Sequence, residues 1–110
     1  MLVGPAGAVF VDWNWLMRGA GWTDFVGLLP LARRDGVDVE AWLTRSALTR
    51  DVPPASIDAW LAVIAAYMLP NADEPVWPGG PPLVRVHQRL YARTFLDWLG
   101  ARRGWTTAQR

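Results

Sequence analysis

The apolar positions of this chain gather in blocks that proline and glycine separate, and most blocks follow the 3.6-residue period of a helix. The strongest block, Ile57–Leu69, reads IDAWLAVIAAYML and is apolar on almost every side of a helical wheel. The preceding DVPPAS stretch suits a helix entry, because proline is well accepted in a first turn. A helix that is apolar all round belongs in the interior. We therefore predict a central helix over Ile57–Leu69 that is buried on most of its faces.

Two shorter helices are expected before the central one. The first begins near Thr23 or Asp24, since either side chain can cap a helix. Its interior residues Gly27 and Pro30 predict that it is short or kinked. The second begins after Asp38, which suits an N-cap, and runs to about residue 49.

A last helix is predicted from about Leu83 to Leu99, with Gly100 as its end. Four of its side chains share one face and predict a contact with the core: Val84, Tyr91, Phe95 and Trp98. Another face carries a row of arginines at i, i+4 spacing, formed by Arg85, Arg89 and Arg93.

The opening segment, residues 9–17, reads VFVDWNWLM and fits both a helix and a strand. As a strand it points the odd positions from Val9 to Met17 inward and Asp12 and Asn14 to water. As a helix it gathers most apolar positions on one stripe and leaves Val11 and Trp15 on the back. A lone strand has no partner in the remaining pattern, so we favour the helix. Trp15 then packs either inside this chain or against another one.

These patterns together predict an all-α fold, a compact bundle of four or five short helices with room for one short N-terminal strand. A chain of 110 residues suits a single helical domain over residues 1–110. Around the helices we expect an N-terminal arm at residues 1–8, a proline-rich loop at residues 70–82 and a basic C-terminal tail at residues 101–110.

Composition narrows the class of protein. The chain is 52% hydrophobic and 19% charged, which argues against disorder. It contains no cysteine and one histidine, His87, so disulfides and zinc sites are not expected. All eleven basic residues are arginine, which is typical of a GC-rich genome and favours a bacterial or phage origin.

The sequence predicts a soluble, cytoplasmic protein without a membrane partner. The longest uncharged run, Ala59–Ala72, falls short of the roughly twenty residues that a membrane span needs. The first residues, MLVGPAGAVFV, lack the basic region of a signal peptide.

Signals for catalysis are weak. A serine nucleophile would have to pair with His87, but Ser46 and Ser56 lie in no nucleophile motif, and Ser56 suits a helix start. The acids near residue 38 fit turn and cap chemistry better than a calcium loop. No glycine-rich phosphate loop is present. We expect no enzyme activity, no cofactor and no metal.

The stretch AVFVD, residues 8–12, resembles the first strand of PIN- and NYN-type nucleases, in which a hydrophobic strand ends on a metal-binding aspartate. The resemblance covers these five residues. It implies further parallel strands alternating with helices and more acids after those strands, and this chain offers neither. Asp12 is therefore not assigned a catalytic role.

Eight tryptophans are many for a chain of this size, and tryptophan is enriched at protein interfaces. Four are predicted on core faces, namely Trp13, Trp42, Trp60 and Trp98. The other four lie on a back face, in turns or in the tail, namely Trp15, Trp22, Trp77 and Trp105. Rings outside the main stripes are difficult to bury within one small domain, so they are candidate contacts for another chain.

Charge is distributed unevenly. From residue 85 onward six arginines accompany one acid, whereas residues 1–84 hold five arginines and nine acids. The basic region comprises the helical row and a C-terminal group with Arg102 and Arg103. Arginine and tryptophan are the side chains that most often anchor protein interfaces.

We therefore predict a non-enzymatic protein–protein interaction module, a small subunit, adaptor or inhibitor in a larger assembly. Its partner is another protein chain, in a homo- or hetero-oligomer. The candidate contacts are Trp15, Trp22, Trp77, Trp105, Arg85, Arg89, Arg93, Arg102 and Arg103. The alternative is a small nucleic-acid-binding protein that uses the arginine-rich last helix and tail.

Overall fold

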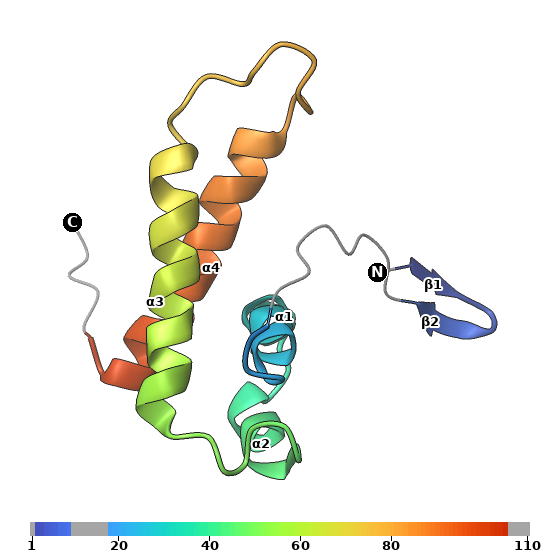
Figure 1. Ribbon diagram of the computed structural model, residues 1–110, viewed down its shortest axis with the longest axis vertical. Coiled ribbons are helices and arrows are strands. Elements are labelled where there is room, and N and C mark those ends of the chain that lie inside the picture. The colour runs from blue at the N-terminus through green and yellow to red at the C-terminus, as the bar shows by residue number, and fades with distance from the viewer. Residues whose placement is uncertain (1, 10–17, 106–110) are drawn as a thin grey trace.

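The computed structural model of the chain describes residues 2–9 and 18–105. Four helices follow a short β-hairpin (Figure 1). The strands are β1 (Leu2–Gly4) and β2 (Gly7–Val9), and the helices are α1 (Thr23–Arg34), α2 (Val39–Arg45), α3 (Pro54–Asn71) and α4 (Val84–Arg103). The predicted small helical bundle with a short N-terminal strand is confirmed.

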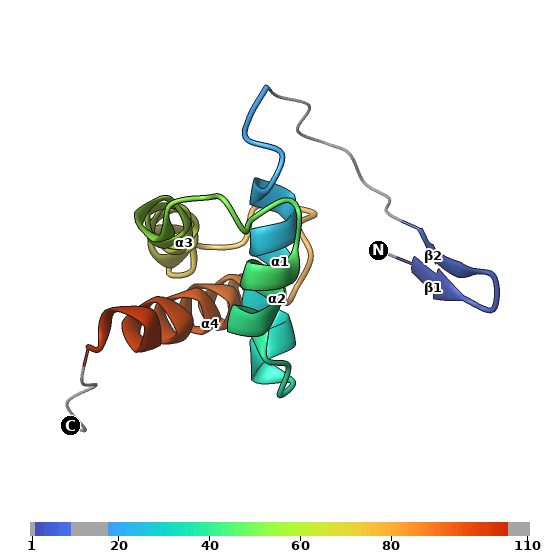
Figure 2. The ribbon, with the colours of Figure 1, turned by 90° about the horizontal axis from the view of Figure 1, so that it is seen from below.

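Helices α3 and α4 run antiparallel beside each other and form the largest contact in the structure (Figure 1). Helix α1 crosses them near the lower half of the pair and is seen end-on in Figure 1 and lengthwise in Figure 2. Helix α2 packs against α1. The upper half of the α3–α4 pair therefore extends beyond the two short helices.

The core lies where all four helices meet. Trp98, Phe95, Leu61 and Val26 are completely or almost completely buried there. Burial of one such side chain contributes about 2–3 kcal/mol, so this junction supplies much of the stability of the fold. The core cluster consists of Val26, Leu29, Val39, Leu43, Ile57, Leu61, Ala65, Phe95, Trp98 and Leu99.

The two short helices begin in different ways. Asp38 caps α2 as predicted, with its side chain accepting a hydrogen bond from the backbone N–H of Ala41 at 3.1 Å. In α1 the N-cap is Trp22, and Thr23 instead donates its hydroxyl proton to the carbonyl of Ala20. The predicted start of the helix near Thr23 is therefore confirmed, but neither Thr23 nor Asp24 is its N-cap, because both already lie inside the helix.

Helix α2 ends at Arg45, before the predicted end near Thr49. The Thr49 side chain is buried and donates to the carbonyl of Leu43 at 2.7 Å. This bond closes the turn that follows α2 and directs the chain into α3. A buried hydroxyl thus stabilises the turn where the sequence predicted a longer helix.

The end of α4 corrects the prediction that Gly100 terminates it. The helix continues through Gly100 and ends at Gly104, whose φ of 65° lies in the left-handed region. The N–H of Trp105 donates to the carbonyl of Gly100, and that of Gly104 to the carbonyl of Ala101. This pair of bonds is a Schellman motif. Residues 101–103 of the predicted tail are therefore helical.

Helix α3 is only partly buried, which corrects the prediction for the central helix. Its buried residues are Ile57, Leu61 and Ala65, along one side. The opposite side, which includes Val63 and Tyr67, is exposed. The predicted loop also begins too early, because Pro70 belongs to the last turn of the helix. Only the tertiary contacts determine which apolar sides are covered.

The hairpin occupies the predicted arm. Its strands pair antiparallel from Leu2 with Val9 to Gly4 with Gly7, and every residue in it is exposed. No residue of the hairpin contacts a described helix. The opening segment, apart from Val9, lies outside the described residues, and so do Trp13 and Trp15.

The two glycines at the end of α4 give a direct test of where the helix ends. Gly104→Ala should lower the free energy of unfolding by about 1 kcal/mol, because a Cβ disfavours the left-handed region. Gly100→Ala should raise it by up to about 1 kcal/mol, because its Cβ makes only ordinary contacts with Trp105 inside a helix. Urea unfolding followed by circular dichroism measures both values. The opposite order of effects would place the end of the helix at Gly100.

Candidate functional site

A charged network joins three helices at the lower end of the bundle. Arg102 of α4 donates its Nε–H to Asp58 of α3 at 2.6 Å and its Nη1–H to Glu40 of α2 at 2.7 and 2.9 Å. The Arg102 and Asp58 side chains are only 10% and 14% exposed. Arg103 adds a weaker contact, with its Nη1 3.6 Å from the other Asp58 oxygen. The guanidinium therefore sits where its two carboxylate partners compensate its desolvation.

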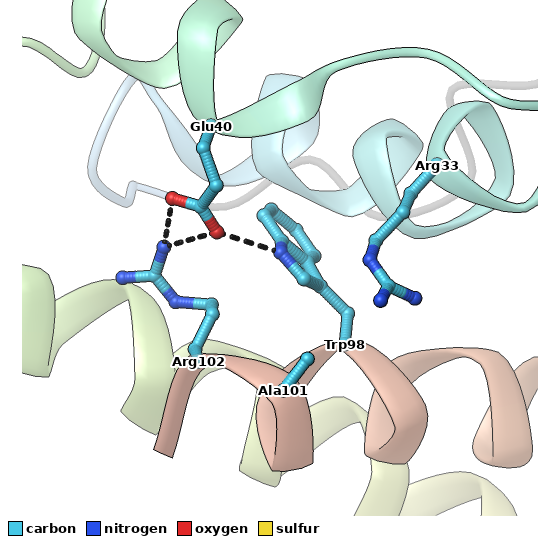
Figure 3. A pocket seen from close by; sticks show the side chains of 5 residues that line it. All are labelled: Arg33, Glu40, Trp98, Ala101 and Arg102. Atoms are coloured by element: carbon cyan, nitrogen blue, oxygen red, sulfur yellow. Dashed lines mark hydrogen bonds and ion pairs between the residues drawn. The ribbon is translucent and has the colours of Figure 1, made fainter. Parts of the chain in front are cut away.

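Trp98 completes the network from the core side. Its indole N–H donates to Glu40 at 2.9 Å, and the Arg102 guanidinium lies over the ring at 5.6 Å from its centroid (Figure 3). Burial lowers the pKa of Arg102, but the hydrogen bonds and charges of Asp58 and Glu40 outweigh that effect and raise the pKa overall. Arg102 thus remains charged, and its role is structural.

A first pocket of about 480 Å³ opens beside this network. Arg33, at the end of α1, reaches toward Trp98 across the pocket (Figure 3). The remaining lining residues are Glu40, Ala101 and Arg102. Because Glu40 and Arg102 already bind each other, this pocket offers a ligand few unused polar groups.

A second pocket of about 590 Å³ adjoins the first and shares Arg33 and Ala101 with it. We call this second pocket the α4 groove. Its lining residues are Arg33, Arg93, Leu96, Asp97, Gly100, Ala101 and Trp105.

Trp105 is positioned in the α4 groove by the end of α4. The Schellman motif reverses the chain after Gly104, and the Trp105 side chain lies within van der Waals distance of the space above Gly100. The ring remains more than half exposed. Because hydrogen bonds already order the main chain at Trp105, binding of a partner need not order that part of the backbone.

The α4 groove carries two positive charges and one negative charge. Among the described residues, neither Arg33 nor Arg93 lies within ion-pair distance of an acid, and Asp97 lies near no base at that distance. Leu96 adds a partly exposed apolar side chain. The groove thus combines unpaired guanidinium groups with apolar and aromatic surface.

The structure separates the predicted contact residues into groups. Arg93 and Trp105 come together in the α4 groove, whereas Arg102 and Arg103 belong to the network with Asp58. Trp22 is half-buried against the core, which argues against its prediction as an exposed contact. Trp15 lies outside the described residues.

Arg85, predicted as a docking residue, instead organises the proline-rich loop. It donates to the carbonyl of Pro75 at 2.6 Å and to the side chain of Gln88 at 2.9 Å. Its guanidinium also lies 5.5 Å from the centroid of the Trp77 ring, in a cation–π contact. Each of its two Nη atoms thus makes a hydrogen bond inside the chain, while its buried Nε finds no hydrogen-bond partner among the described residues.

Trp77 begins a tight turn that holds this loop. The N–H of Gly80 donates to the carbonyl of Trp77, and Gly79 has a φ of 79°, so residues 77–80 form a type II turn with Pro78 in its second position. A Cβ on Gly80 would lie only 2.8 Å from the Trp77 ring and from Val76. The Trp77 ring is therefore packed over Gly80 on one side, although it is more than half exposed.

Arg89 binds the start of the same loop. Its Nη1 donates to the carbonyl of Ala72 at 2.9 Å and to the Asp73 carboxylate at 3.0 Å. Two members of the predicted arginine row thus hold the connection between α3 and α4. Only Arg93 of that row lies in the α4 groove.

Trp42 is the clearest error among the predicted core residues. It is 53% exposed on α2, although the helical period placed it beside Leu43 on a core face. Trp60 and Trp98 are packed against the core as predicted, and the Trp60 N–H donates to the carbonyl of Thr23. Helix α2 is short and contacts only α1 broadly, so one side of it suffices for packing.

Within the described part of the chain, His87 lies on α4 in an aromatic cluster and not beside a group of acids. His87 packs against Tyr91 with ring centroids 4.9 Å apart, and Tyr91 stacks on Phe95. Burial raises the pKa of Tyr91. Over residues 2–9 and 18–105, no three metal-ligating side chains converge.

Comparison with known proteins identifies no relative. No protein-family model, no curated protein and no solved structure matches this chain. None of the helices in the described part combines the length and apolar character that a membrane crossing requires.

Glu40 and Asp58 are the residues that the sequence interpretation missed. Glu40 was assigned to turn and cap chemistry, and Asp58 was given no role. Asp58 is the single charge within the apolar block Ile57–Leu69. An isolated acid in such a block usually has a buried partner, and this signal pointed to a cation elsewhere in the chain.

The network should dominate stability at the lower end of the bundle. Arg102→Leu should lower the free energy of unfolding by about 3 kcal/mol, because it leaves the Asp58 carboxylate buried without its partner. Arg50→Leu is the matched control, since Arg50 and Asp51 form an exposed pair that contributes less than about 1 kcal/mol. Urea unfolding compares the two variants. Equal losses would show that the buried network contributes no more than a surface pair.

The packing of Trp77 over Gly80 can be tested in the same way. Gly80→Ala should cost about 2 kcal/mol, because its Cβ would collide with the Trp77 ring and force the turn apart. Gly27→Ala, in open space inside α1, should instead stabilise by about 0.5–1 kcal/mol. The Gly80 variant should also shift the tryptophan emission spectrum. An unchanged stability and spectrum for Gly80→Ala would contradict the packing.

Proposed function

We propose that this protein is a non-enzymatic protein–protein interaction module, a small subunit, adaptor or inhibitor in a bacterial or phage assembly of the cytoplasm. The observation that carries the proposal is the α4 groove, in which Arg33, Arg93 and Trp105 surround partly exposed apolar surface. Arginine and tryptophan dominate the binding energy of protein interfaces.

The groove favours an acidic segment of a partner that carries an apolar side chain. Its two arginines outnumber its one acid, and guanidinium groups bind carboxylates in a bidentate manner. Leu96 and the Trp105 ring provide apolar surface between these charges. Charge would then orient the partner, and burial of the indole would contribute most of the affinity.

The groove replaces the mechanism that the sequence suggested. That mechanism used the row Arg85, Arg89 and Arg93 together with Trp77. Arg85 and Arg89 instead bind the proline-rich loop, so they are less available to a partner than the row alone suggests. Arg93 and Trp105 are the predicted contacts that we retain.

Nucleic-acid binding is the second candidate, since an indole beside two arginines could stack a base and hold a phosphate. The internal hydrogen bonds of Arg85, Arg89 and Arg102 weaken this candidate. Non-specific binding to nucleic acid requires many phosphate contacts, and these three guanidinium groups already bind acceptors within the chain.

Affinity capture with groove variants tests the proposed function. The tagged wild-type protein, expressed in cells of its source organism, should retain a specific protein after nuclease treatment. Trp105→Ala should lower the retained amount at least tenfold, because truncating a hot-spot residue costs 2 kcal/mol or more, and Arg93→Glu should act in the same direction.

Trp42→Ala is the matched control, because Trp42 is an equally exposed indole away from the groove. It should leave the capture unchanged. Capture of no protein by the wild type, or equal capture by Trp105→Ala and Trp42→Ala, would contradict the proposal. Nuclease-sensitive, salt-sensitive retention of nucleic acid would favour the second candidate.

A further inference from the structure

The outer face of α3 is apolar and exposed along most of its length. Val63 and Tyr67 are each 57% exposed, and Leu69 is about half exposed. The face runs along the helix from residue 59 to residue 70 at the i, i+3, i+4 spacing of a single stripe. It consists of Ala59, Ala62, Val63, Ala66, Tyr67, Leu69 and Pro70.

This outer face carries no charged side chain. The single acid in the helix, Asp58, points away from it and binds Arg102 on α4. Figures 1 and 2 both show α4 and α1 on the other side of α3, so no described element covers the outer face. An exposed helix face is ordinarily polar, and a continuous apolar one marks a contact with another surface.

We infer that a second copy of this chain covers the outer face, with the two α3 helices antiparallel across a two-fold axis. A two-fold interface places each surface patch against itself, so a patch without charge meets no like charge. The surface of an ordinary partner carries charged side chains of both signs. Those charges would lose their hydration against the outer face of α3 and find no opposite charge there, which would disfavour such a partner. The face is therefore complementary to itself.

The charges at the two ends of α3 select the antiparallel arrangement. Two exposed acids follow the C-terminal end of the helix: Asp73, which pairs with Arg89, and Glu74, which forms no ion pair within the described residues. Arg103 lies at the N-terminal end, where its Nη1 approaches Asp58 with more than half of its side chain exposed. An antiparallel pair brings the acidic end of one copy to the basic end of the other, whereas a parallel pair opposes like ends. The helix dipoles also favour antiparallel packing.

Side-chain size at the centre of the face allows the two helices to pack closely. Ala62 and Ala66 lie one turn apart near the middle of the stripe, and Val63 and Tyr67 flank them. The stripe from Ala59 to Pro70 spans about 16 Å of helix. A contact of this length lies at the small end of specific interfaces, so we expect a dimer that dissociates in the micromolar range.

This dimer would leave the α4 groove without a role in self-association, because the two surfaces share no residue. The inference thus goes beyond the proposed function and can fail separately from it. A groove variant such as Trp105→Ala should still dimerise, and a dimer-breaking variant should still bind the partner of the groove.

The oligomeric state tests the inference with two matched valines. Sedimentation velocity over a range from below micromolar to submillimolar concentration should show the wild type passing from monomer to dimer. Val63→Glu should be monomeric throughout, because it brings two carboxylates together near the two-fold axis. Val86→Glu, at an equally exposed helical valine of α4, should dimerise like the wild type.

Variants of opposite charge at Val63 show whether a loss of dimerisation comes from the interface or from misfolding. A mixture of Val63→Glu and Val63→Arg should form a heterodimer, while each variant alone stays monomeric with unchanged helical circular dichroism. A wild type that is monomeric at every concentration would overturn the inference. Loss of dimerisation in Val86→Glu to the same extent as in Val63→Glu would overturn it as well.

Disulfide trapping then tests the direction of the helices, since the native chain contains no cysteine. A mixture of Ala59→Cys and Leu69→Cys should form the mixed disulfide in preference to either homodisulfide, because antiparallel packing opposes the two ends of the stripe. Predominant homodisulfides would contradict the antiparallel arrangement.

Discussion

The ion pairs of Arg102 are the interaction on which the rest of the structure depends. A guanidinium this far from solvent needs compensating carboxylates, and they come from two other helices, Glu40 on α2 and Asp58 on α3. The same Glu40 carboxylate accepts the indole proton of Trp98, the largest fully buried side chain. One charge thus sets how α2, α3 and α4 lie relative to one another, and the end of α4 that carries Trp105 follows from it.

Much of the basic character of the C-terminal region serves this internal purpose. Arg85 and Arg89 hold the connection between α3 and α4, and Arg102 holds the lower end of the bundle. The number of arginines in the C-terminal region is therefore larger than the number of guanidinium groups that are free to contact a partner. What is left for recognition is local: Arg33 and Arg93 in the α4 groove, and the uncharged outer face of α3.

The helical class, the four main helices, the Asp38 cap and most of the core follow from periodicity and from proline and glycine placement. The errors have two origins. Gly100 was placed at a helix end because glycine favours that position. Trp42 was placed in the core and α3 in the interior because a hydrophobic pattern shows which residues share a face. No pattern shows how many neighbours that face has. Helix α2 lies closest to α1 and reaches α4 through the Glu40 side chain, and α4 continues past Gly100, so that Arg102 meets Glu40 and Asp58.

The sequence by itself determined that this chain forms short helices with apolar stripes, because hydrophobic period and turn chemistry are local properties. Tertiary structure alone decided which stripes are covered, that Asp58 and Glu40 meet Arg102, and that Arg93 and Trp105 share a groove. These contacts join residues as far as 62 positions apart, and only the packing of α2, α3 and α4 brings them within reach of one another. Spacing along the chain carries no record of such pairs.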